Sequence, residues 1–231
     1  MRIAVQQPYF FPYLEYFQLI NAVQKFVVYD DVNFIKRGWI NRNRILMNGE
    51  IHRFTLHLHG ASQNRLINEI TVGENKEKIL KTIFCAYKKA PYFSENFPLV
   101  ESVLLSREKN LCLFLSEMLM QLASYFGINA TFNYSSEIPK DKTLKGQQKV
   151  LEICKLENAK EYINLPGGSK LYDQNMFGQV NISIKFLQKA TTTYPQFKKQ
   201  FIPGLSIIDV LMFNSGTRVK EFLDQYKLSE L

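Results

Sequence analysis

The residues best suited to chemistry gather between positions 36 and 44. These nine residues hold four cations, two asparagines and the single tryptophan of the chain. Guanidinium groups bind phosphate oxygens in pairs, asparagine hydrogen-bonds a base or sugar hydroxyls, and an indole offers a face for a ring. The alternative is a solvated basic loop with its tryptophan in the core. The segment favours a nucleotide or sugar-phosphate site, with these candidate residues: Lys36, Arg37, Trp39, Asn41, Arg42 and Asn43.

Two adjacent acids, Asp30 and Asp31, precede this segment at the end of an expected strand. They could hold Mg²⁺ with substrate phosphates, bind ribose hydroxyls, or accept a proton from an amine. The structural alternative is that they cap a turn and pair with Lys36 or Arg37. We predict Asp31 as the catalytic base, with Asp30 and Lys36 as further catalytic candidates.

Loops after expected strands supply the remaining candidates. The opening motif, Gln7 to Tyr13, joins a strand to a helix, and open α/β sheets bind ligands beyond the carboxyl ends of their strands. An aromatic turn packed in the core is the alternative. Two later loops add candidates: one carries a lysine and the other a Gly-Gly pair. Paired glycines let the backbone approach a phosphate, but they are also common in turns without a ligand. The candidates are Gln7, Pro8, Tyr13, Lys145, Asn164, Gly167, Gly168 and Tyr172.

No metal site is predicted. Three cysteines lie far apart without a CxxC pair, and His57 and His59 share a strand face without a third ligand nearby. Asp209 lies in a highly apolar helix, so it should pair with a cation or cap a backbone group.

The pattern of elements predicts one α/β domain over residues 1–231, a layered sheet with helices on both faces. It opens as a βαβ unit, with strands at 2–7 and 26–29 around a helix at 13–22. Asn48-Gly49 predicts a hairpin within an insertion at about 45–72. Helices are expected around 79–87, 111–126 and 145–155, strands at 130–134, 161–164 and 182–187, and a helical C-terminus at about 205–231, with helices at 205–213 and 218–226.

Composition limits the partners. The chain is 46% hydrophobic and carries a net charge of +8, which favours an anionic ligand. It has no basic run of five or more and no RGG-type repeat, so DNA is not an expected partner. Neither a signal peptide nor an apolar run of bilayer length is visible, so we expect a cytoplasmic protein. A homo-oligomer is compatible with the sequence.

The chain resembles the WbqC-like family, which occurs in bacterial gene clusters for O-antigen and other surface polysaccharides. The resemblance rests on the motif from Gln7 to Tyr13, on Tyr29-Asp30-Asp31 with the basic segment, on Leu144 to Gln147, on Tyr162 to Asn164 with Gly167-Gly168, and on Ser206 to Asn214. It implies polysaccharide biosynthesis near the inner face of the cytoplasmic membrane.

A more distant resemblance is to nucleotidylyl transferases and pantoate-activating ligases, which have a Rossmann-like fold and a His-x-Gly-His motif. Tyr13 and Tyr16 replace both histidines, and Glu15 replaces the glycine. This similarity adds Tyr16 to the candidate residues and implies a nucleotidylyl-transferase-like sheet. The loss of both histidines argues against ordinary nucleotidylyl transfer.

Three hypotheses follow. The first is a transferase that places an acyl or aminoacyl group on a dTDP- or UDP-linked amino sugar, as the family's setting and the basic segment suggest. The second is an ATP-dependent ligase that activates a carboxylic acid as an adenylate. The third is a non-catalytic scaffold that presents the nucleotide sugar to membrane-bound enzymes. The sequence leaves ATP, an acyl or aminoacyl donor and Mg²⁺ open as cofactors.

Overall fold

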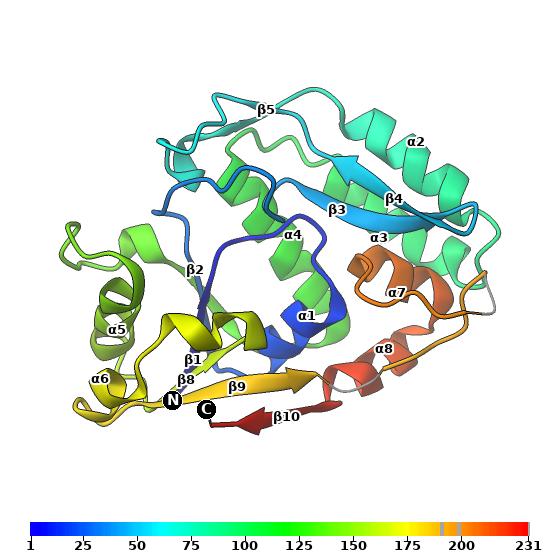
Figure 1. Ribbon diagram of the computed structural model, residues 1–231. Helices are drawn as coiled ribbons and strands as arrows, with labels where there is room; N and C mark the ends of the chain where they lie inside the picture. The colour runs from blue at the N-terminus through cyan, green and yellow to red at the C-terminus, as the bar shows by residue number, and fades with distance from the viewer. Residues whose placement is uncertain (190–191, 198–199, 231) are drawn as a thin grey trace.

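A mixed, mainly parallel sheet forms the centre of the protein (Figure 1). The computed structural model describes residues 1–189, 192–197 and 200–230. The strand order in the sheet is β10-β9-β8-β1-β2-β7, and β10 alone runs antiparallel to its neighbour. The strands are β1 (Arg2–Gln6), β2 (Lys25–Val28), β7 (Thr131–Tyr134), β8 (Glu161–Asn164), β9 (Ser183–Lys189) and β10 (Tyr226–Ser229).

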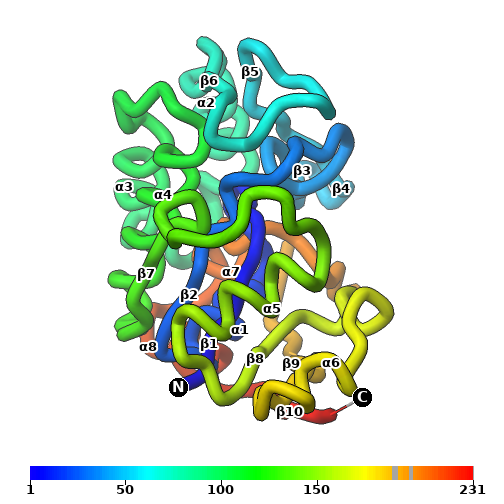
Figure 2. The backbone as a smooth tube through the Cα atoms, turned by 90° about the vertical axis from the view of Figure 1, so that its left-hand side faces the viewer, coloured from blue at the N-terminus to red at the C-terminus, as the bar shows by residue number. Residues whose placement is uncertain are grey.

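Helices cover both faces of the sheet, which confirms the predicted fold class. Alternate residues of β1 point to opposite sides, so Ala4 joins one core while Ile3 and Val5 join the other. The first core is covered by α1 (Leu14–Asn21), α4 (Leu111–Phe126) and α8 (Gly216–Leu223), and the second by α5 (Gly146–Leu156) and α6 (Gln174–Gly178). Figure 2 looks at the molecule from the side of α5.

A large insertion lies between β2 and β7. It contains the hairpin of β3 (Arg42–Met47) and β4 (Glu50–Thr55), the short pair β5 (Leu58–His59) and β6 (Thr71–Val72), and the helices α2 (Lys76–Tyr87) and α3 (Phe93–Leu104). The predicted turn is confirmed: Asn48 and Gly49 have φ angles of 52° and 76°, both in the left-handed region that a type I′ hairpin turn needs. The insertion packs together at one end of the sheet (Figures 1 and 2).

The strand order reverses at β1. The chain leaves β1 through α1 to reach β2 on one side, whereas β8 and β9 lie on the other side. The ladder between β1 and β8 pairs two positions, against four between β1 and β2. Such a switch point is where open α/β sheets form a ligand crevice.

Several elements differ from the sequence-based expectation, among them α6, which was not predicted. Helix α3 was not predicted, and it contains Pro98 in its second turn. The helix expected at 218–226 ends at Leu223, and Tyr226 to Ser229 form β10 against β9. The helical assignment of the last residues was therefore wrong, because strand pairing with β9 overrides the helical spacing of the apolar residues. Within the described residues, no helix combines the length and apolar composition needed to cross a membrane.

Candidate functional site

A cleft of about 710 Å³ opens at the carboxyl ends of β1 and β8. Its walls come from the loop after β1, the start of α1, the loop after β2, the first residues of β3, the loop after β8 and the segment before α7 (Ile207–Phe213). The volume lies within the range of about 300–1,000 Å³ that is usual for small-molecule sites. The cleft therefore occupies the switch point of the sheet and is the candidate functional site.

The side of the cleft formed by β8 depends on Asn164, which is 3% exposed. Gln6 donates a hydrogen bond to the Asn164 side chain, and the same oxygen accepts the backbone N–H of Leu165 at 2.7 Å. Gly168 packs so closely that a Cβ there would lie 2.4 Å from Asn164 Nδ2, whereas Gly167 has open space at that position. The two glycines therefore differ: only Gly168 is required by a close approach.

The opposite wall is held by Asn43, which is 1% exposed. Its Nδ2 donates to the backbone carbonyls of Phe10 at 3.0 Å and Phe11 at 2.7 Å. Ser206 Oγ also donates to the Phe11 carbonyl at 2.8 Å. Phe11 has a φ of 42°, an uncommon value for a bulky residue. These donors stabilise that conformation and so fix the loop that leads from β1 to α1.

Arg44 is the cation among the described residues that line the cleft. Its guanidinium carbon lies 5.2 Å from the centre of the Trp39 ring, and its Nη2 donates to the Gly204 carbonyl at 2.8 Å. Its Nε is buried and has no hydrogen-bond acceptor among the residues that the structure describes. Buried donors without acceptors are rare in folded proteins.

The acid of the cleft is Glu15, the one carboxylate among its described lining residues. Four tyrosines line the same space: Tyr9, Tyr13, Tyr29 and Tyr172. Burial raises the pKa of each of these phenols, and the negative charge of Glu15 adds to the increase at Tyr13. The phenols therefore stay protonated at neutral pH and offer the cleft neutral hydroxyl groups and ring faces.

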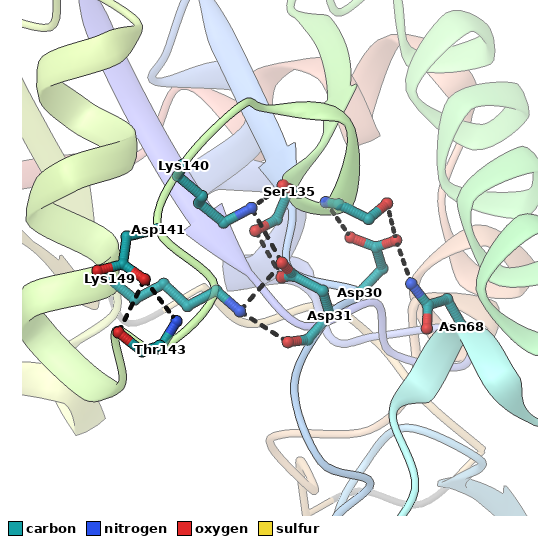
Figure 3. Close-up of polar contacts among 9 residues, drawn as sticks. Asp30, Asp31, Asn68, Ser135, Lys140, Asp141, Thr143 and Lys149 are labelled. Atoms are coloured by element: carbon teal, nitrogen blue, oxygen red, sulfur yellow. Dashed lines mark hydrogen bonds and ion pairs between the residues drawn. The ribbon is translucent and has the colours of Figure 1, made fainter.

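Asp31 lies outside the cleft lining, in a group of ion pairs at the carboxyl ends of β2 and β7 (Figure 3). Ser135 Oγ donates to its Oδ1 at 2.6 Å, and Lys140 Nζ and Lys149 Nζ lie 2.9 and 3.0 Å from its Oδ2. Burial raises the pKa of Asp31, but these three donors outweigh it and the net pKa is lowered. A carboxylate with a lowered pKa is a weak general base.

Asp30 is also fully engaged (Figure 3). It is 2% exposed and accepts the Ser136 backbone N–H at 2.9 Å, the Ser136 hydroxyl at 2.6 Å and Asn68 Nδ2 at 3.0 Å. These two aspartates do not fit Mg²⁺, because two ammonium groups already take the place of a cation at Asp31. Across the described residues, no group of three or more histidines, cysteines, aspartates or glutamates converges as metal ligands.

The candidates from the sequence divide into two sets. Those that line the cleft are Gln7, Tyr13, Trp39, Asn43, Asn164, Gly167, Gly168 and Tyr172. Those that do not line it are Pro8, Tyr16, Asp30, Asp31, Lys36, Arg37, Asn41, Arg42 and Lys145.

Several residues of the second set position the walls. The buried Tyr16 donates its hydroxyl to the Gln7 carbonyl at 2.7 Å. Asn41 Nδ2 donates to the Leu56 carbonyl and Arg42 Nε to the Gly38 carbonyl, each at 2.9 Å. These bonds hold the loops in place.

Sequence reasoning did not choose other lining residues, among them Gln6, Tyr9, Glu15, Tyr29, Ile35, Arg44, Leu171 and Gly204. Glu15 and Arg44 both stood inside recognised motifs. The available signal for Arg44 was its place in the basic segment directly after Asn43, which does line the cleft. No local signal pointed to Gly204, which reaches the cleft through the tertiary fold.

Asp209 was expected to pair with a cation or to cap a backbone group, and this expectation was wrong. Its carboxylate accepts from Tyr87 at 2.7 Å, Tyr194 at 2.8 Å and Gln196 at 2.7 Å, and within residues 1–189, 192–197 and 200–230 no cation or backbone N–H donates to it. Burial raises the pKa of Asp209, and the three donors only partly oppose it. The network joins residues 192–197 to α2 and α7. The Gln196 side chain also hydrogen-bonds the backbone N–H and carbonyl of Ile202, two residues before Gly204, whose carbonyl accepts from Arg44.

Comparison with known proteins gives a family match along most of the chain. The model of the WbqC-like protein family matches residues 7–221. The uncharacterized protein Rv1507c of Mycobacterium tuberculosis is 26% identical over 229 residues, which cover 96% of this chain and 97% of that protein. No solved structure matches.

Proposed function

The chain belongs to the WbqC-like protein family, and from this premise we propose that it is a transferase of surface-polysaccharide biosynthesis. In this proposal it places an acyl or aminoacyl group on the amine of a nucleotide-linked amino sugar. The observation that carries the proposal is that one cleft joins a cation, an indole and a carboxylate, in Arg44, Trp39 and Glu15. A nucleotide sugar with an amine presents an anion, a planar base and a cation.

The nucleotide end is assigned to Arg44 and Trp39. A guanidinium group binds diphosphate oxygens in a forked geometry. The Nε of Arg44, which has no acceptor within the described part of the chain, supplies an additional donor once the side chain turns toward the ligand. The indole beside it offers a face to the base. The buried side chains of Asn43 and Asn164 hold the two walls of the cleft in place by hydrogen bonds to backbone groups.

The amine end is assigned to Glu15. An amine attacks an acyl carbon only when it is neutral, so its ammonium form must first lose a proton. The ammonium form first loses one proton to water. In the proposed step the neutral amine nitrogen then bonds to the carbonyl carbon of an activated acyl donor, and the bond from that carbon to the leaving group breaks, so that the leaving group departs with the electron pair. Glu15 accepts the second proton, which the nitrogen loses as the amide forms. Glu15 replaces Asp31 in this role because Asp31 lies outside the cleft lining and has a lowered pKa.

Ligand binding tests the nucleotide assignment. Purified protein is screened by thermal shift against UDP- and dTDP-amino sugars, the corresponding sugars without the amine, ATP and a short oligonucleotide. A ligand at one hundred times its Kd stabilises the fold by about 2.7 kcal/mol. We expect stabilisation by an amino-sugar nucleotide, a loss of affinity of about tenfold or more in Arg44→Gln, and no change in Arg107→Gln, which alters an exposed arginine elsewhere.

The result also separates the alternatives. Stabilisation by ATP alone favours the adenylate-forming ligase, and stabilisation by the oligonucleotide alone rejects a nucleotide-sugar site.

Turnover tests the role of Glu15. With the amino-sugar nucleotide and a series of activated acyl donors, we expect Glu15→Gln to bind the acceptor about tenfold more weakly or less, because the ion pair with its ammonium form is lost. At saturating acceptor the variant should lose about a hundredfold or more in kcat. Unchanged turnover in this variant removes Glu15 from the mechanism. Binding by the wild type without turnover on any donor favours the scaffold hypothesis.

A further inference from the structure

Two aliphatic side chains stand exposed at the mouth of the cleft. Ile35 is 50% exposed and Leu171 is 67% exposed, and both line the cleft although they come from different loops. A single exposed apolar side chain needs no explanation. Two exposed apolar side chains at the same opening, one from the loop after β2 and one from the loop after β8, form a small apolar surface that does require an explanation.

Cations flank both side chains. Lys36 and Arg37 directly follow Ile35, and Lys170 directly precedes Leu171; all three are exposed. Residues 32–49 and 162–172 contain no aspartate or glutamate. Across the described part of the chain, none of these three cations forms an ion pair.

The positive charge extends onto the β3–β4 hairpin. Partial burial lowers the pKa of Arg42, and the nearby charges of Arg53 and Arg37 lower it further. The guanidinium group of Arg42 therefore lies close enough to those of Arg53 and Arg37 to be repelled by both. Arg53 also faces Arg44 directly across the hairpin. Like charges that are gathered in this way lower the stability of the isolated protein and favour an anionic partner.

We propose that the mouth of the cleft docks on a bilayer that contains anionic lipid. Ile35 and Leu171 enter the interface between headgroups and acyl chains, and Lys36, Arg37 and Lys170 contact the headgroups. Aliphatic tips flanked by cations match such a surface, which combines a buried apolar layer with negative charge. Single-stranded nucleic acid is recognised instead through exposed aromatic faces, and these tips are aliphatic.

This inference goes beyond the proposed function, because it does not depend on which small molecule the cleft takes. It has a geometric consequence for the cleft. Docking by its rim turns the opening toward the membrane, so that a ligand anchored in the bilayer reaches the cleft without leaving the surface.

Vesicle flotation tests the proposal with the full-length protein. We expect binding to mixed phosphatidylcholine–phosphatidylglycerol vesicles, little binding to pure phosphatidylcholine, and weaker binding as salt rises. The variants Ile35→Ser and Leu171→Ser should each lower the partition coefficient about tenfold. The matched controls are Leu113→Ser and Leu156→Ser, each 41% exposed on α4 and α5, and they should bind as the wild type does.

Three experimental outcomes would overturn the membrane-docking proposal. The proposal fails if the wild type does not float with the mixed vesicles, or if the Ile35→Ser/Leu171→Ser double variant floats as well as the wild type. Light scattering is run in parallel, and a self-association that this double variant abolishes, without vesicle binding, identifies a second copy as the occupant and overturns the proposal. Because both side chains are exposed, the variants should keep the wild-type Tm, and circular dichroism checks that they are folded.

Discussion

Replacing Asp31 with asparagine should destabilise the protein rather than act on catalysis directly. The carboxylate is the shared partner of Lys140 and Lys149, whose side chains are 3% and 8% exposed. Asparagine keeps the shape but leaves two buried ammonium groups without a counter-charge. Removing one partner of a buried ion pair costs about 3–5 kcal/mol. Because the Asp31 side chain is itself 17% exposed, we expect the lower end, about 3 kcal/mol.

This loss can be measured as a Tm shift. For a chain of this size each kcal/mol corresponds to roughly 2–4 °C, so Asp31→Asn should lower the Tm by about 6–12 °C. The matched control is Asp141→Asn, which alters an exposed aspartate whose hydrogen-bond partner is Thr143 in its own loop, and it should shift the Tm by about 2 °C or less. A Tm for Asp31→Asn within about 2 °C of the wild type would refute the reasoning.

The pH dependence gives an independent check. The folded pKa of Asp31 is below its usual value of 3.8, so the unfolded chain takes up the proton more readily than the folded chain does. The stabilisation by Asp31 is therefore fully present above about pH 3.8 and is lost as the pH falls through the folded pKa. The wild type and Asp31→Asn should differ most in free energy of unfolding near neutral pH, and the difference should narrow in acid.

Two further substitutions test single contacts. Tyr87→Phe removes the hydroxyl that accepts the Leu46 backbone N–H and donates to the buried Asp209 carboxylate. Denaturant titration should show that the free energy of unfolding falls by about 2–3 kcal/mol. A decrease below about 0.5 kcal/mol would contradict this. Gly168→Ala should displace the Asn164 side chain, and calorimetry should show ligand binding in the cleft weakened about tenfold. The added methyl group of Gly167→Ala meets no atom within 4 Å, so this variant should bind with wild-type affinity. Equal affinities in the two variants would count against the close contact between Gly168 and Asn164.

The layered sheet could be predicted because short stretches of sequence determine most of its strands and helices. Strands such as β2 are short β-branched and aromatic runs, and α4 carries a long apolar stripe that ends at Gly127 in the left-handed conformation. The errors at α3 and β10 arose where the local sequence does not decide the structure. Helix α3 tolerates Pro98, and β10 exists because β9 leaves an edge for it.

The candidate site was only partly predictable. Loops at the ends of β1 and β8 could be identified because parallel strands place their carboxyl ends at one edge. The partners of Asp31 could not, since Lys140 and Lys149 lie more than a hundred residues away in sequence and reach it through β7 and α5. Asp31 and Glu15 look equally suited to chemistry as residue types. The cleft lining distinguishes them, and it depends on the whole fold.

The position of β1 also has a consequence for how the chain folds. β1 precedes the other strands of the sheet in chain order and lies inside the sheet, yet one of its two neighbours is β8, which begins only at Glu161. Until β8 is available, one edge of β1 is unpaired, with Ile3 and Val5 on that strand. Contacts between such distant segments slow folding and leave strand edges open to wrong pairing. We therefore expect fragments that end before β8 to aggregate, and the cleft to form only in the last stage of folding, when β8 pairs with β1.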